Sequence, residues 1–101
     1  MGWKKVLFGM ACFFITQFVI ADEVRNVELL ASSCASCHGT RGHSVAGTPS
    51  LAGLDRLYFM QQMDQFISKT RTSTVMNQHA SGYTADEIEL LADFFSQQKS
   101  P

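Results

Sequence analysis

The chain lacks the clustered positive charge with which proteins bind nucleic acids or anionic membrane surfaces. Its 8 lysine and arginine residues are outnumbered by 9 aspartate and glutamate residues, and neither sign forms a block. The chain also has no internal repeat and no low-complexity tract. With 101 residues it has room for one domain at most. These absences argue against a nucleic-acid partner and predict a single small domain.

A hydrophobic run long enough to span a membrane, about 20 residues, is also missing. The most apolar stretch, Val6 to Ile20, is shorter and is interrupted by two polar residues. It follows two lysines and precedes Ala21, which is the pattern of a cleavable export signal. We therefore predict a signal peptide at residues 1–21 and a mature domain at residues 22–101 in the periplasm, with no membrane span after cleavage. A retained anchor is the alternative.

Cysteine is scarce, with 3 residues, and Cys12 lies within the predicted signal peptide. The other two, Cys34 and Cys37, stand three apart, and His38 follows directly, giving the letters CASCH. This spacing is the attachment signature of a c-type haem, because both thiols can reach the porphyrin vinyl groups while the histidine reaches the iron. We predict one covalent haem c, with thioethers at both cysteines and His38 as the proximal ligand.

Three other interpretations of this cysteine pair remain. A zinc site requires about four ligands, and without a second cysteine pair His43 or His79 would have to complete it. A thioredoxin-like redox pair requires a βαβ context, and the flanking sequence shows no strand-like alternation. A structural disulfide is compatible with an exported chain but leaves His38 unexplained. Since no second CxxCH occurs, the haem interpretation implies a single haem.

Around this motif the hydrophobic pattern predicts helices. A first helix begins near Asn26, carries Cys34 on its inner face and ends at Gly39. A second helix covers Leu54 to Ser68, with one apolar arc made of Phe59, Met63, Phe66 and Ile67. A final helix begins with a capping box of Thr84 and Glu87. Its apolar stripe, which we expect to pack on the first helix, consists of Ile88, Leu91, Ala92 and Phe95.

The loop after the first helix must pass close to the proximal side of the haem. It is either a connector alone or a support for the iron ligand. In the second case a backbone carbonyl near Pro49 accepts a hydrogen bond from the second ring nitrogen of His38. Such a bond would fix the imidazole tautomer and raise its basicity toward iron.

The candidates for the sixth iron ligand are Met60, Met63, Met76 and His79. The first two lie on the predicted second helix, where we expect them to be core residues. Met76 ends the polar segment that starts at Thr70, and a loop residue there can cross to the face opposite His38 without distorting a helix. The polar neighbours of Met76 also give it no apolar stripe to join. We therefore predict Met76, with the other three residues or an open site as alternatives.

Beyond residue 21 the sequence resembles the small class I c-type cytochromes of bacteria over nearly its whole length. Among these it is most similar to the haem-carrying subunits of flavocytochrome c sulfide dehydrogenases. The matching segments are CASCHGTRG from Cys34, PSLAG at Pro49 to Gly53, Tyr58 followed by Phe66, STVM at Ser73 to Met76 and SGYTADEIELLADFF at Ser81 to Phe95.

The resemblance implies an all-α class I cytochrome c fold, with three to four helices around one covalent haem. It implies His38 and Met76 as axial ligands and the Pro49 carbonyl near His38. It further implies one-electron transfer with no catalytic residue in this chain, in a heterodimer with an FAD flavoprotein that oxidises sulfide. A monomeric, free-standing carrier in a respiratory chain is the alternative, and a haem sensor or enzyme with an open sixth site is a third interpretation.

Overall fold

The computed structural model describes residues 26–101, so the predicted signal peptide at residues 1–21 and its cleavage after Ala21 lie outside the described residues. The described part of the chain contains helices and no strand. Its first helix is described over residues 26–38, and we call it the motif helix because it ends in CASCH. It is followed by the 3-10 helix η2 (Thr40–Gly42), α2 (Arg56–Ile67), α3 (Met76–Ala80) and α4 (Ala85–Ser96).

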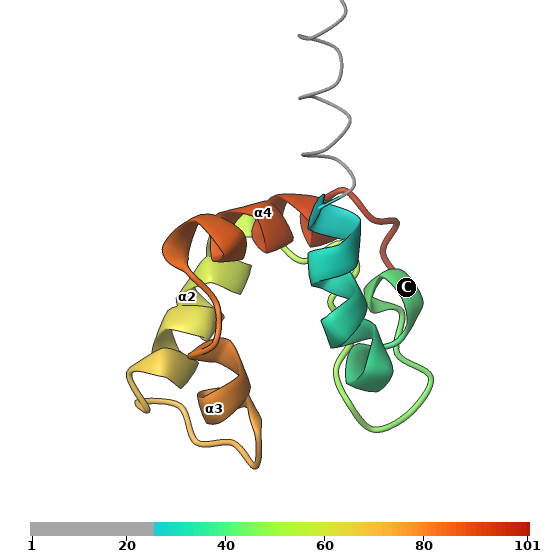
Figure 1. The fold of residues 1–101 in the computed structure, drawn as a ribbon. Coiled ribbons are helices and arrows are strands. Elements are labelled where there is room, and N and C mark those ends of the chain that lie inside the picture. The colour runs from blue at the N-terminus through green and yellow to red at the C-terminus, as the bar shows by residue number, and fades with distance from the viewer. Residues whose placement is uncertain (1–25) are drawn as a thin grey trace, which may run out of the picture.

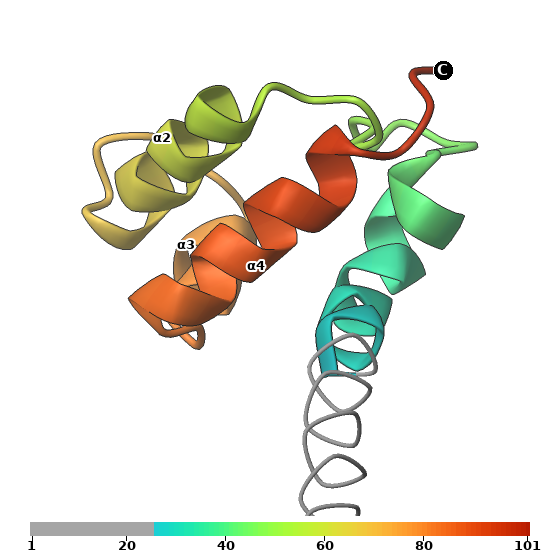
Figure 2. The same ribbon diagram turned by 90° about the horizontal axis from the view of Figure 1, so that it is seen from above.

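The helices form an arch, with α4 joining its two sides (Figure 1). The α3 side consists of α2, α3 and the segment between them, and α2 packs on both α3 and α4. The motif side consists of the motif helix and residues 39–53, which lie across the arch from α3 (Figure 1). The two sides are also separate when the molecule is seen from above (Figure 2). No helix in the described range is long and apolar enough to cross a membrane.

The motif helix ends at His38, as predicted, because the next residue is a glycine in the left-handed region. Gly39 has a φ of 87°, and its N–H donates to the carbonyl of Ala35 at 2.9 Å. A Cβ at this position would collide with the carbonyl oxygen of His43. Only glycine therefore permits this turn, which sends the chain back toward the end of the motif helix.

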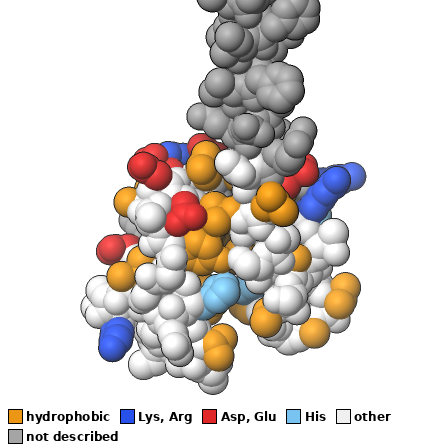
Figure 3. All heavy atoms as spheres, viewed as in Figure 1, with side chains coloured by type: hydrophobic (Ala, Val, Ile, Leu, Met, Phe, Trp, Pro, Cys, Tyr) orange, Lys and Arg blue, Asp and Glu red, His pale blue; other side chains and the backbone are white. Residues whose placement is uncertain are grey.

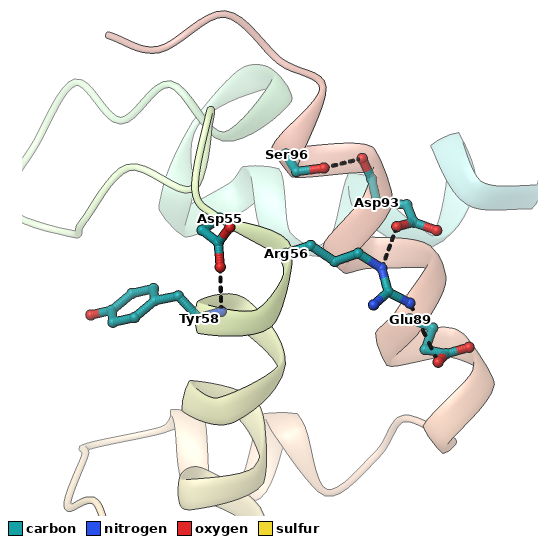
Figure 4. Close-up of polar contacts among 6 residues, drawn as sticks. All are labelled: Asp55, Arg56, Tyr58, Glu89, Asp93 and Ser96. Atoms are coloured by element: carbon teal, nitrogen blue, oxygen red, sulfur yellow. Dashed lines mark hydrogen bonds and ion pairs between the residues drawn. The ribbon is translucent and has the colours of Figure 1, made fainter.

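The observed α2 agrees closely with the predicted second helix. Asp55 is its N-cap, and the carboxylate of this residue accepts a hydrogen bond from the N–H of Tyr58 at 3.1 Å (Figure 4). Three residues of the predicted apolar arc are buried, namely Phe59, Met63 and Phe66. The fourth, Ile67, is exposed, because it lies at the last position of the helix, where α2 gives way to the polar segment.

The predicted capping box of α4 is present, with Thr84 and Glu87 each accepting a hydrogen bond from the backbone of the other. The predicted apolar stripe of α4 is buried in full. Phe95 is 1% exposed, and its ring centroid lies 5.7 Å from that of Phe59 on α2. The same buried cluster includes Ala31 from the motif helix. The buried residues of α4 therefore belong to a core that includes residues from both sides of the arch.

Polar contacts at the surface also join α2 to α4. Arg56 donates to the carboxylate of Asp93 at 2.6 Å and lies 3.4 Å from that of Glu89 (Figure 4). The hydrogen bond and charge of Asp93, with a smaller contribution from Glu89, raise the pKa of Arg56. All three side chains are about half exposed, so we attribute little of the stability to this ion pair and most to the core beneath it.

The helix α3 was not foreseen from the sequence. The segment from Thr70 was predicted to remain an extended loop as far as Met76, whereas Met76 is the first residue of α3. A helix of five residues is too short to show an apolar period or to be stable alone, so it depends on tertiary contacts.

Candidate haem-binding site

The CASCH residues occupy the end of the motif helix. Cys34 is buried in the core cluster, Cys37 is exposed and His38 is partly buried. Cys34 and Cys37 form no disulfide with each other. Because they are three apart on a helix, they lie on neighbouring positions of one face. Burial raises the pKa of the Cys34 thiol, and hydrogen bonds with Tyr83 and Ser33 partly offset this effect.

The predicted hydrogen bond between His38 and Pro49 is present. The Nδ1 atom of His38 lies 2.6 Å from the carbonyl oxygen of Pro49. A carbonyl oxygen only accepts, so Nδ1 must carry the proton, and the lone pair of the neutral ring is then on Nε2. The chain thus presents an imidazole in the tautomer that leaves Nε2 available to a metal ion.

The backbone around Pro49 is anchored rather than free. The N–H of Leu51 donates to the carbonyl of Gly42 at 2.8 Å, and that of Gly53 donates to the carbonyl of Phe95 in α4 at 2.9 Å. At Gly42 the packing is so close that a Cβ would lie 2.9 Å from the Phe95 ring. These contacts fix the loop to α4, and the loop in turn fixes the His38 ring.

On the opposite side of the arch, Met76 is partly buried and packs against the core cluster. Most sequence neighbours of Met76 are polar, and its apolar contacts come from other segments of the chain. On α2, Met63 is 5% exposed within the core and Met60 packs partly buried against it, as expected for core residues. His79 is exposed on α3, three residues after Met76. Met76 and His79 thus share one face of a short helix.

Hydrophobic side chains gather between the two sides of the arch, and histidine side chains lie next to them (Figure 3). The chain thus combines two thiols on one helix face, an imidazole with Nε2 available, a thioether on the opposite side and apolar surroundings. This set of groups fits a covalently attached haem, which is a large apolar plate whose iron takes ligands from protein side chains.

Tyr83, which the sequence analysis did not single out as a site residue, links the two sides of the arch. Its hydroxyl lies 2.6 Å from the hydroxyl of Ser33, next to Cys34 on the motif helix, and 3.3 Å from Nε2 of His79. Burial raises the pKa of Tyr83, partly offset by the hydrogen bond with Ser33. No sequence signal marks this pair, because the two hydroxyls are 50 residues apart.

The alternative interpretations of the cysteines find no support in residues 26–101. No group of three or more histidine, cysteine or acidic side chains there could hold a metal ion, so the zinc interpretation is wrong for this region. The Nε2 atom of His43 donates instead to the carbonyl of Lys99 at 2.7 Å. No strand flanks the motif within this range, so the βαβ context of a thioredoxin-like pair is missing there as well.

Comparison with known proteins identifies the family to which this arrangement corresponds. The family model described as Cytochrome c matches residues 25–99. Over 68 residues the chain is 47% identical to the cytochrome subunit of sulfide dehydrogenase from Chlorobaculum tepidum, covering 67% of this chain and 62% of that protein. Over 73 residues it is 34% identical to a thiosulfate dehydrogenase electron acceptor from Stutzerimonas stutzeri, covering 70% of this chain and 34% of that protein.

Among solved structures, the chain is similar to cytochrome c4 from Acidithiobacillus ferrooxidans, with a TM-score of 0.60 and 36% sequence identity. That match covers 62% of this chain and 37% of the cytochrome c4 chain. The chain therefore spans about three fifths of the first relative and about a third of the second and of the solved structure.

Proposed function

The chain belongs to the cytochrome c family, and we propose that it transfers single electrons through one haem c with His38 and Met76 as the axial ligands. The predicted all-α class I fold and the predicted covalent haem c are confirmed by the family match and by the likeness to cytochrome c4. The roles of the individual residues and the partner are the proposal.

The hydrogen bond between His38 and the Pro49 carbonyl is the observation that carries this proposal. A metal-binding histidine is usually oriented by a hydrogen bond from its other ring nitrogen, which also makes the ligand more basic. His38 follows directly after Cys37, so attachment through Cys34 and Cys37 would bring the porphyrin over this imidazole. A histidine held only for packing would not need both the motif and the oriented tautomer.

Met76 is the proposed sixth ligand because it lies on the side of the arch opposite the motif helix, at the start of α3. Its thioether borders the apolar cluster, whereas the His79 ring is exposed and lies edge-on to Tyr83, with 5.6 Å between ring centroids. His79 stays an alternative ligand because it shares a helix face with Met76.

Once haem c is bound, the residues of the chain favour electron transfer in two ways. When bound, haem c supplies an iron that exchanges one electron between its ferric and ferrous states. His38 is held by a loop that is anchored to α4, so the imidazole moves little during the exchange. The apolar cluster excludes water and disfavours the additional positive charge of the oxidised state, which raises the potential.

We further propose that the chain functions in the periplasm, in a heterodimer with a sulfide-oxidising flavoprotein. Its support is the 47% identity to a cytochrome subunit of sulfide dehydrogenase. A monomeric, free-standing carrier is the second candidate, since another relative is named as an electron acceptor for thiosulfate dehydrogenase. Mixing the oxidised protein with sulfide, with and without a flavoprotein partner, separates the two, because only the subunit model predicts flavoprotein-dependent reduction of the haem by sulfide.

The Met76→Ala variant tests the ligand assignment. We expect it to lose the low-spin spectrum of the His/Met pair and to bind carbon monoxide when reduced, because an axial position becomes available. The matched control is Met63→Leu, which changes a methionine buried in α2 and should leave the spectrum unchanged. An unchanged spectrum in Met76→Ala would assign the sixth ligand to another residue.

A further inference from the structure

The segment at residues 68–75 connects α2 to the proposed ligand Met76, and all of its residues are exposed. A polar, exposed connection of this kind would ordinarily leave the next residue loosely placed. Here the residue after Met76 limits that freedom. Asn77 is partly buried, and both polar atoms of its side chain have hydrogen-bond partners.

The Asn77 side chain joins three parts of the chain. Its Nδ2 donates to the carbonyl of Phe66 in α2 at 2.9 Å and to the carbonyl of Arg71 at 2.8 Å. Its Oδ1 accepts from the hydroxyl of Ser73 at 2.6 Å, and its own backbone N–H donates to that hydroxyl at 2.8 Å. These four bonds connect the end of α2, the polar segment and the first turn of α3.

Two of the three partners of Asn77 are fixed to α2, since Phe66 belongs to that helix and Arg71 contacts it. The guanidinium carbon of Arg71 lies 4.6 Å from the centroid of the Phe66 ring, in a cation–π arrangement. The same guanidinium donates to the side chain of Gln62, and the backbone N–H of Arg71 donates to the carbonyl of Gln65 at 3.2 Å. Asn77 therefore attaches α3 to α2 directly through Phe66 and indirectly through Arg71.

We propose that Asn77 is the positioning residue for the sixth iron ligand, holding Met76 against the iron and thereby limiting the fraction of molecules in which the thioether is detached. This inference rests on the proposed function. A neutral thioether is a soft ligand that binds ferric iron weakly, so its occupancy depends on how far the fold fixes it in advance. A helix as short as α3 cannot fix its own first residue, whereas Asn77 ties that turn to α2.

Imidazole binding to the ferric, haem-loaded protein measures the detached fraction. Imidazole occupies the sixth position only where Met76 is detached, so its apparent affinity rises in proportion to that fraction. Each hydrogen bond of this kind changes an equilibrium by about two- to tenfold. We expect Asn77→Ala to bind imidazole about tenfold more tightly than the unmodified protein. We also expect weakening of the ferric absorption band that arises from methionine–iron charge transfer.

Two further variants keep the test valid if Asn77→Ala folds poorly. Asn77→Asp retains the size and the acceptor oxygen but loses both N–H donors, so it should change imidazole affinity in the same direction. Ser73→Ala removes only the bonds to the serine hydroxyl and should give a smaller change. The matched control is Ser68→Ala, which loses hydroxyl bonds to Thr70 and to the Gln65 carbonyl, neither of which reaches α3, and its imidazole affinity should be unchanged.

Normal imidazole affinity in both Asn77→Ala and Asn77→Asp would overturn the inference, even if their thermal stability fell, because Asn77 would then only stabilise the fold. The Met76→Ala variant tests the proposed function separately from the role of Asn77. If Met76→Ala retained the charge-transfer band, Met76 would not be the ligand, and the inference would fall with that assignment. If Met76→Ala lost the band while the Asn77 variants behaved normally, only the role of Asn77 would be wrong.

Discussion

The two sides of the arch hold their proposed iron ligands by different means. On the motif side, His38 belongs to the same short motif as the two proposed attachment cysteines, and its ring is oriented by the backbone carbonyl of Pro49. On the α3 side, Met76 is placed by side-chain hydrogen bonds of Asn77 and by apolar packing. The arrangement on the motif side could be predicted from the sequence, because it depends on backbone groups and a contiguous motif. The second side depends on individual side chains that meet only in the folded chain.

The largest effect is expected from removing the two thiols of the motif side, through which the haem would be attached. The double variant Cys34→Ala/Cys37→Ala should retain no haem after denaturation in acidic acetone, because neither thioether can form. The matched control is Ser36→Ala, which lies between the two cysteines and loses only a hydrogen bond to the Ser33 carbonyl. It should retain the full covalent haem content, measured by the pyridine haemochrome spectrum. Haem that stayed bound to the double variant would contradict the attachment assignment.

A smaller effect is expected from the turn that brings Pro49 to His38. Gly39→Ala places a Cβ at a φ of 87° and against the His43 carbonyl, so we expect a loss of about 1–3 kcal/mol in the free energy of unfolding. Gly47→Ala, in the same loop, is the matched control, because a Cβ there would meet nothing within 4 Å. Urea unfolding of both variants measures the difference. Equal stability of the two would show that the turn at Gly39 is not constrained.

The smallest expected effect concerns the hydrogen bond between Tyr83 and Ser33, which joins the two sides of the arch. Tyr83→Phe removes the hydroxyl that contacts Ser33, and we expect a loss of about 1 kcal/mol near neutral pH. Burial raises the pKa of Tyr83 above its ordinary value of about 10, so its neutral form stabilises the fold below that pH. This contribution is lost as the pH rises through the raised pKa, because Tyr83 ionises more readily in the unfolded chain than in the folded one.

The stability difference between Tyr83→Phe and the unmodified protein should therefore shrink above about pH 10. Tyr58→Phe is the matched control, since Tyr58 is 47% exposed on α2. Denaturant unfolding of both variants near neutral pH and at alkaline pH gives the comparison. A difference for Tyr83→Phe that stayed constant across this range would mean that ionisation of Tyr83 is not coupled to folding.

Much of the fold was predictable because its helices carry local signals. The capping box at Thr84 and Glu87, the end of the motif helix at Gly39 and the span of α2 all follow from neighbouring residues. The contact between His38 and Pro49 was one of two interpretations of the loop and was also implied by the family resemblance. The helix α3 and the apolar surroundings of Met76 were not foreseen, because no local pattern encodes them.

The sequence by itself indicated the haem-attachment motif and the long helices, because cysteine spacing and apolar periodicity are properties of contiguous residues. Only the tertiary structure decided how the α3 side is held. The bonds of Asn77 to Phe66 and of Tyr83 to Ser33 join residues that are 11 and 50 positions apart. Such polar contacts leave no periodic trace in the sequence, since each depends on one side chain meeting one partner after the helices have packed.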